Sequence, residues 1–319
     1  MIRRNFLIGT AFAGLALTHS AARAQFGNIG GIVKGLGGTP KLPKLLSGPE
    51  PVSTSIKDAV YGDPSRDGWK APARVGDLAA LERTAAGGFV LAAGYHRMTA
   101  QSYCLHAGTH GPGGGDGYLY APLKGSARDA VTSILQNSVA KPHIAQRDIQ
   151  LLLWAIVSRS KFENLNNNLK VVASELLTPQ QIASLNRGAL SVLTSSEFQR
   201  VAGGVPEPLR SVMQAESRMR GMFSGPSLAY ADMERVAMLA GAVPRGEGSI
   251  DTPATRWSHH PDGYWVRYIP SGYSQTQVEI FVEAGSGAVG TTYDPATCVA
   301  VPGNTARQRL AQSGRVYGR

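Results

Sequence analysis

The sequence predicts an α+β protein in which a central helical bundle is joined by small antiparallel sheet elements from the N-terminal and C-terminal parts of the chain. Two patterns carry this prediction. Apolar residues recur at helical spacing through most of residues 127–240. On either side of that stretch, β-branched and aromatic residues alternate along short segments bounded by glycine and proline. Helices in the middle with strands from both ends are typical of the α+β class.

The first 24 residues have the form of an export signal. Arg3-Arg4 precedes an uncharged apolar stretch, residues 6–17, and the small-residue cleavage site Ala22-Arg23-Ala24. The apolar stretch is shorter than the roughly 20 residues that a membrane span needs. We therefore expect cleavage before Gln25, no transmembrane span in the mature chain, and a periplasmic or secreted location. The run Arg3-Arg4-Asn5-Phe6-Leu7 also resembles the twin-arginine signal of proteins that fold before export.

The charge of the mature chain narrows the class of partner. Removal of the signal would leave 29 basic and 22 acidic side chains, a net charge of +7. The basic residues are scattered and form no run of five or six, so the composition argues against a nucleic-acid-binding arm. A general attraction to acidic cell-surface polymers is compatible with the charge. We expect a cell-surface protein or polysaccharide as partner, and the oligomeric state stays open.

Composition divides the mature chain into three parts. Residues 25–64 are rich in glycine and proline and are predicted to form a flexible leader, with an ordered but irregular path over the domain surface as the alternative. Residues 65–244 form the predicted mixed strand and helical domain. Residues 245–319 form a C-terminal β-hairpin region and tail, which we expect to pack on the same domain.

The predicted elements follow from local spacing. Segments 88–91 and 95–105 alternate as strands of a small sheet, and a loop of six glycines follows at 108–117. Thr178-Pro179-Gln180-Gln181 has the residues of a helix start, with Thr178 as N-cap. The helical spacing predicts helices at 127–134, 146–160, 169–177, 179–193 and 207–240.

In the C-terminal part, the spacing of apolar residues changes from helical to alternating. Segments 264–269 and 275–282 alternate around Pro270-Ser271-Gly272-Tyr273, which predicts a β-hairpin with a loop of four or five residues. The remaining tail contains several prolines and glycines. We expect one helical turn there, at residues 305–311.

Two short motifs point to chemistry at a cysteine. Tyr103-Cys104-Leu105 lies on a predicted strand, and Gln150 precedes Trp154 by four residues on an apolar helix. Over about residues 88–160 this pattern resembles the thioester domains of bacterial surface adhesins, with Ile149 where that family usually has threonine. The resemblance implies that the Cys104 sulfur and the Gln150 carboxamide condense, with loss of ammonia, to an internal thioester. Apolar neighbours would keep water from such a bond.

Cys104 has other interpretations. In an oxidising compartment, a disulfide with Cys298 is the default for a chain with two cysteines, and two free thiols are the remaining state. A disulfide and a thioester exclude each other at Cys104. Gln150 can equally be a polar residue at the edge of a core-facing helix stripe.

Two histidines near Cys104 suggest an alternative function. His106 or His110 beside a cysteine would suit a cysteine-dependent hydrolase or transferase acting on envelope polymer. The His-x-x-x-His spacing suits a metal only on a helix, which Gly108 disfavours, so we expect no metal and no cofactor. The sequence therefore predicts an exported, surface-associated binding or attachment protein rather than an enzyme. A disulfide-stabilised structural protein is a third interpretation.

Overall fold

A computed structural model describes residues 49–318 except 71, 73, 114, 204, 206–208 and 227. The predicted signal and the first part of the predicted leader lie outside the described residues. Within these residues, no helix combines the length and the apolar character that crossing a membrane requires.

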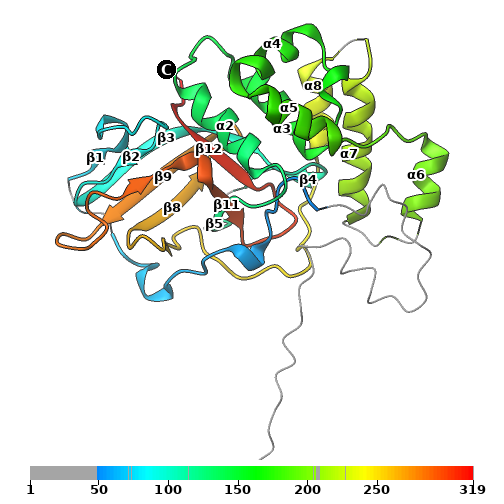
Figure 1. Ribbon diagram of the computed structural model, residues 1–319. Coiled ribbons are helices and arrows are strands. Elements are labelled where there is room, and N and C mark those ends of the chain that lie inside the picture. Colours follow the sequence, from blue (N-terminus) through cyan, green and yellow to red (C-terminus); the bar gives the residue numbers. More distant parts are fainter. Residues whose placement is uncertain are drawn as a thin grey trace, which may run out of the picture.

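Six antiparallel strands close into a β-barrel that occupies one side of the molecule (Figure 1). Each strand pairs with two neighbours, so none of the six is an open edge along its whole length. In their order around the barrel the strands are β3 (Gly94–Cys104), β12 (Leu310–Val316), β11 (Cys298–Pro302), β5 (Tyr118–Pro122), β8 (Trp265–Pro270) and β9 (Gln275–Val282), and β9 pairs with β3 to close the ring.

Six short strands accompany the barrel. One lies parallel to β3, one extends the sheet beyond β8, and the other four form two separate two-stranded ladders. The strands are β1 (Gly76–Asp77) beside β3, β7 (Ser258–His259) beside β8, β2 (Phe89–Val90) with β10 (Thr292–Tyr293), and β4 (Thr109–His110) with β6 (Met238–Leu239).

The described chain has seven α-helices on one side of the barrel (Figure 1). The helices are α2 (Arg128–Val139), α3 (Gln146–Val157), α4 (Asn167–Leu176), α5 (Pro179–Arg187), α6 (Ser195–Ala202), α7 (Leu209–Phe223) and α8 (Tyr230–Ala237), and short 3-10 turns lie at Ile56–Asp58, Pro64–Arg66, Leu78–Ala80, Phe162–Asn164 and Pro295–Thr297. Helix α6 lies beyond α7, farthest from the barrel (Figure 1). One hydrophobic core runs from the barrel into most of these helices, and α6 packs with α7 in a second, smaller cluster.

The predicted fold class is wrong, because the centre of the molecule is a closed barrel and not a helical bundle. The strands that close it come from both ends of the described chain. β11 is buried at all five positions and β12 at its first five, since α2 packs over β12 from outside. Strands covered on both faces lack the polar and apolar alternation that marks a half-buried strand. The expected helical turn at 305–311 is also wrong, because Leu310 begins β12.

Elements with a clear local pattern are confirmed. The predicted hairpin is β8 and β9, in which Val266, Tyr268 and Val278 are buried. Thr178 caps α5 in a reciprocal hydrogen-bonding arrangement with Gln181.

Two predicted helices have other bounds. The single helix expected over 207–240 is instead two, α7 and α8, separated by residues 224–229. The expected helix 179–193 ends at Arg187, and α6 follows it.

The described part of the predicted leader lies on the barrel. Ser53 forms a β-bridge with Lys124, and Val52 is buried. The Ser258 hydroxyl donates a hydrogen bond to the Val60 carbonyl at 3.0 Å. Residues 49–64 therefore follow an irregular but ordered path over the barrel, and residues 50–54 form one wall of the site described next.

Candidate functional site

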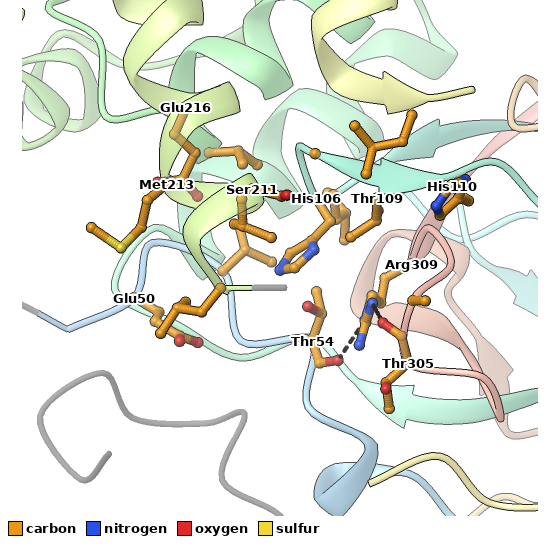
Figure 2. A pocket seen from close by; sticks show the side chains of 18 of the residues that line it. Glu50, Thr54, His106, Thr109, His110, Ser211, Met213, Glu216, Thr305 and Arg309 are labelled. Atoms are coloured by element: carbon orange, nitrogen blue, oxygen red, sulfur yellow. Dashed lines mark hydrogen bonds between the residues drawn. The ribbon is translucent and has the colours of Figure 1, made fainter. Parts of the chain in front are cut away.

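A cavity of about 250 Å³ lies where the barrel meets α7 (Figure 2). Its described lining comes from six parts of the chain: residues 50–54, the segment 105–110 after β3, residues 157 and 159 at the end of α3, α7, residues 239 and 244 after α8, and the turn before β12. Most of its wall is apolar, and the apolar side chains come from Val52, Leu105, Val157, Leu209, Val212, Met213 and Leu239 among others. Arginine, glutamate and histidine side chains interrupt this wall.

Gly108 allows the segment after β3 to approach α7 closely. Its backbone has φ +68°, in the left-handed region that favours glycine, and its N–H donates to the Ala237 carbonyl at 2.8 Å. A Cβ atom at this position would lie 2.6 Å from the Ser211 carbonyl oxygen of α7. The first glycine of the glycine-rich loop therefore shapes the cavity rather than forming a free turn.

Arg309 is a buried cation on the wall of the cavity. Only 3% of the residue is exposed, and its Nε and Nη1 atoms donate to the carbonyls of Thr54, Thr305 and Arg307 at 2.6 to 3.3 Å. No described carboxylate forms an ion pair with it, and its Nη2 makes no hydrogen bond to the described residues. Burial lowers the pKa of Arg309 to about 10, so the guanidinium stays charged at neutral pH.

Two carboxyl groups also line the cavity. Glu216 projects from α7 and Glu50 from the segment before Val52, and neither carboxylate forms a hydrogen bond or an ion pair with the described residues. Burial raises the pKa of Glu216 to about 7, although the charges of Arg220 and Arg159 oppose the rise. Burial likewise raises the pKa of Glu50. Both acids are therefore more easily neutralised than surface glutamates.

His106 and His110 both line the cavity. Figure 2 shows the His106 ring between α7 and Arg309. Burial and the charge of Arg309 lower the pKa of His106 to about 3, so the imidazole is neutral at physiological pH. The Nδ1 atoms of both histidines are buried without a hydrogen-bond partner. The described residues contain no group of three His, Cys, Asp or Glu side chains that could hold a metal ion.

The structure brings Cys104 and Gln150 together, but through the backbone of the cysteine. The Cys104 N–H donates to Gln150 Oε1 at 2.8 Å, and Gln150 Nε2 donates to the Cys104 carbonyl at 3.1 Å. One turn earlier in α3, Gln146 Nε2 donates to the Ser102 carbonyl at 3.1 Å. Pairing of β3 with β9 ends at Gln101, so the two glutamines take the place of a neighbouring strand along the end of β3.

The Cys104 thiol lies in a different environment from the histidines. It is fully buried and is not part of the cavity wall, whereas His106 and His110 are. Burial, with a contribution from the charge of Glu234, raises the pKa of this thiol well above its usual value. A nucleophilic cysteine needs the opposite shift.

The two cysteines are free and lie apart. Cys104 pairs with Leu310 of β12, Leu310 pairs with Ala300 of β11, and Cys298 lies two residues before Ala300. Two strand spacings alone separate the backbones by about 10 Å, beyond the limit of about 7 Å between Cα atoms for a disulfide. Burial raises the pKa of Cys298 to about 12, so it too is held as a thiol.

Sequence reasoning missed three of the charged groups of the cavity. Arg309, Glu216 and Glu50 come from distant segments, and no short motif contains them. A signal existed only for Glu216, which lies at helical spacing between the buried residues Met213 and Arg220 of α7. A charged residue at such a position indicates either a buried ion pair or a site.

Comparisons of the chain with known protein families, with curated proteins and with solved structures found no match. Function is therefore inferred from the geometry of the site.

Proposed function

We propose that this chain is an exported binding protein whose ligand occupies the cavity between the barrel and α7. The observation that carries the proposal is a mostly apolar cavity of about 250 Å³ whose wall holds the buried Arg309 guanidinium, which forms no ion pair with the described residues. Buried polar groups in folded proteins are almost always paired, because leaving them unpaired is costly. A ligand with matching polar groups would supply the missing partners. The export part of the proposal depends on the signal-like residues 1–24.

Binding is favoured over turnover by the state of the reactive groups. The cavity wall contains no thiol, and the pKa of Cys104 shifts away from that of a nucleophile. His106 is neutral and has no described hydrogen-bond partner that would orient it as a general base. Convergent polar groups in a mostly apolar, enclosed volume are typical of a ligand pocket.

Methyl NMR of the full mature chain tests whether small molecules enter the cavity. With methionine methyl groups labelled, we expect a mixture of small organic fragments to shift the Met213 signal, which Met213→Leu assigns. Val212→Trp and Leu239→Trp fill the cavity from its wall and rim and should abolish the shift. Val171→Trp introduces the same residue at a 57% exposed position on α4 and should preserve it. A Met213 signal that no fragment moves would contradict the proposal.

An attachment function through a Cys104–Gln150 thioester is a second candidate. It is supported by the direct contact of the Gln150 side chain with Cys104 in a fully buried place. In the condensation, Cys104 Sγ attacks Gln150 Cδ, the C–N bond breaks, and the nitrogen leaves as ammonia. The Gln150 carboxamide would have to give up its hydrogen bonds to the Cys104 backbone.

Intact mass of the mature protein distinguishes the states of Cys104. A thioester would lower the mass by one ammonia and leave one free thiol, and methylamine would then add to residue 150. Cys104→Ala should restore the full mass, whereas the matched variant Cys298→Ala should not. A full-mass protein with two titratable thiols after unfolding would exclude the thioester and leave cavity binding unaffected.

A further inference from the structure

We propose that the ligand of this cavity is a small amphipathic monocarboxylate, bound with its carboxylate on Arg309 and its apolar body along α7. The inference rests on the proposed binding function and assigns it a ligand class. Its basis is the position of one buried guanidinium at the edge of an apolar, enclosed volume.

Arg309 has the geometry of an anion-binding residue. Its Nε and Nη1 atoms are held by three backbone carbonyls, which fix the plane of the guanidinium. Neutral carbonyls cannot balance its charge, and the nearest acid in electrostatic terms, Glu50, makes no ion pair with it. Nη2 is the nitrogen left without a described hydrogen bond. A carboxylate accepts hydrogen bonds from a guanidinium in this planar arrangement.

The other acids of the cavity do not cancel this charge. Glu50 and Glu216 each interact electrostatically with Arg159, and Glu216 also interacts with Arg220. Glu50 also interacts with Arg309, so two acids face three arginines and the group carries one positive charge in excess. An anion rather than a cation therefore completes the cavity.

His106 would complete the carboxylate site. Its ring lines the cavity, and Figure 2 places it between Arg309 and α7. Its Nδ1 is occluded and neither ring nitrogen has a described partner, so the partly exposed imidazole presents Nε2 to the cavity. In the Nε2–H tautomer a neutral imidazole donates one hydrogen bond, which suits a second carboxylate oxygen.

The rest of the wall limits the size and character of the ligand. A cavity of about 250 Å³ is large enough for a short organic acid. Leu209, Val212 and Met213 present apolar surface from α7. Leu105 adds apolar surface from the end of β3, and Val157 from the end of α3. These side chains suit an unbranched or branched alkyl body.

A matched series of compounds tests the charge. Hexanoate, hexanamide and hexylamine share one alkyl chain and differ in their head group. We expect titration of the full mature chain, followed by the Met213 methyl signal, to give hexanoate an affinity about tenfold or more above that of hexanamide, as a charge-assisted hydrogen bond does. Hexylamine should bind most weakly. Equal affinities, or tighter binding of the amine, would overturn the monocarboxylate assignment.

Substitutions then locate the head group. Arg309→Gln should reduce hexanoate to the affinity of hexanamide without changing hexanamide, and Arg309→Lys should keep part of the preference. Arg315→Gln is the matched control, because Arg315 also donates to backbone carbonyls, those of Ile144 and Pro142, away from the cavity. It should leave both affinities unchanged.

His106→Phe tests the site even if the Arg309 variants unfold, because His106 has no described hydrogen bond to lose. It should lower hexanoate affinity severalfold more than hexanamide affinity. Unchanged discrimination in both His106→Phe and a folded Arg309→Gln would overturn the assignment. If hexanamide and neutral fragments bind while hexanoate shows no preference, only the ligand class fails. If no compound moves the Met213 signal, the proposed function fails with it.

Discussion

The end of β3 separates two buried regions that treat their polar groups in opposite ways. At Cys104, the backbone N–H and carbonyl both have partners on the Gln150 side chain. Two residues later, His106 enters a cavity where its own nitrogens, the Glu216 carboxylate and Arg309 Nη2 have none within the described chain.

The contrast indicates that the Cys104–Gln150 region stabilises the fold, whereas the cavity is a site for a ligand. A satisfied pair such as Cys104 and Gln150 stabilises the protein by itself, because both groups would be costly to bury alone. Unpaired charges are retained against that cost when they serve a site. Changes at Gln150 should therefore act on stability, and changes in the cavity should act on binding and on pH dependence.

Gln150→Leu should give the largest loss of stability, about 2 to 5 kcal/mol. The substitution leaves the Cys104 N–H and carbonyl buried without partners, at about 1 to 3 kcal/mol for each group. Urea unfolding of the mature chain measures the change. Gln180→Leu on the exposed face of α5 is the control and should change stability by less than about 0.5 kcal/mol. A loss below about 1 kcal/mol for Gln150→Leu would mean that the glutamine does not support β3.

Gly108→Ala should come next, with a loss of roughly 2 to 3 kcal/mol. The new Cβ would meet the Ser211 carbonyl oxygen at 2.6 Å, and φ is +68°. Gly115→Ala separates the two causes, because Gly115 has φ +92° with open space around it. We expect Gly115→Ala to show the backbone cost alone, about 1 kcal/mol. Equal losses in urea unfolding would show that α7 does not pack tightly on the segment after β3.

Sequence patterns predicted the elements that depend only on neighbouring residues in the chain. The β8–β9 hairpin shows alternation because the buried Val266, Tyr268 and Val278 have less exposed side chains than their immediate neighbours in the strands. The start of α5 is marked by four consecutive residues. β11 and β12 show no such alternation, because every residue of β11 and the first five of β12 are buried, the polar Gln312 and Ser313 among them. Barrel closure pairs β3 with β12, about two hundred residues apart, and no window of sequence contains both.

The candidate site shows the same division. The Tyr103-Cys104-Leu105 and Gln150 motifs pointed to two residues that do touch, but spacing alone could not tell that the Gln150 amide meets the Cys104 backbone. The charge of Arg309 could not be assigned to a site, because its burial depends on Thr54 and on the turn at Thr305. Burial and missing partners are properties of the assembled chain.

Glu216→Gln should change how stability depends on pH. In the folded protein the pKa of Glu216 is about 7, whereas the unfolded chain ionises it near 4.5. The folded state therefore holds the extra proton, and stability falls as pH rises from 4.5 through 7, by about 3 kcal/mol at most. Arg220, Arg159 and Glu50 are the charges that act on this carboxyl.

Urea midpoints between pH 4.5 and pH 8 measure the effect of Glu216→Gln. We expect this variant to gain stability relative to the unmodified protein at pH 8 and to lose that advantage at pH 4.5. Glu163→Gln, at an exposed position, should follow the unmodified protein throughout. If the urea midpoints of Glu216→Gln and of the unmodified protein depend on pH in the same way, the Glu216 carboxyl is exposed to solvent and is not an unpaired group of the cavity.

The smallest change in stability should come from removing a threonine hydroxyl, either one at the cavity or one that is hydrogen-bonded beside β3. Thr109 Oγ1 is buried at the cavity without a partner, so Thr109→Val should be neutral or slightly stabilising. Thr276 Oγ1 instead donates to Ser102 Oγ at 3.0 Å, and Thr276→Val should cost about 1 kcal/mol. The same exchange of a hydroxyl for a methyl group should therefore change the free energy of unfolding in opposite directions at the two positions. If both variants lose stability equally in urea unfolding, the Thr109 hydroxyl has a partner and the cavity is better satisfied than its geometry indicates.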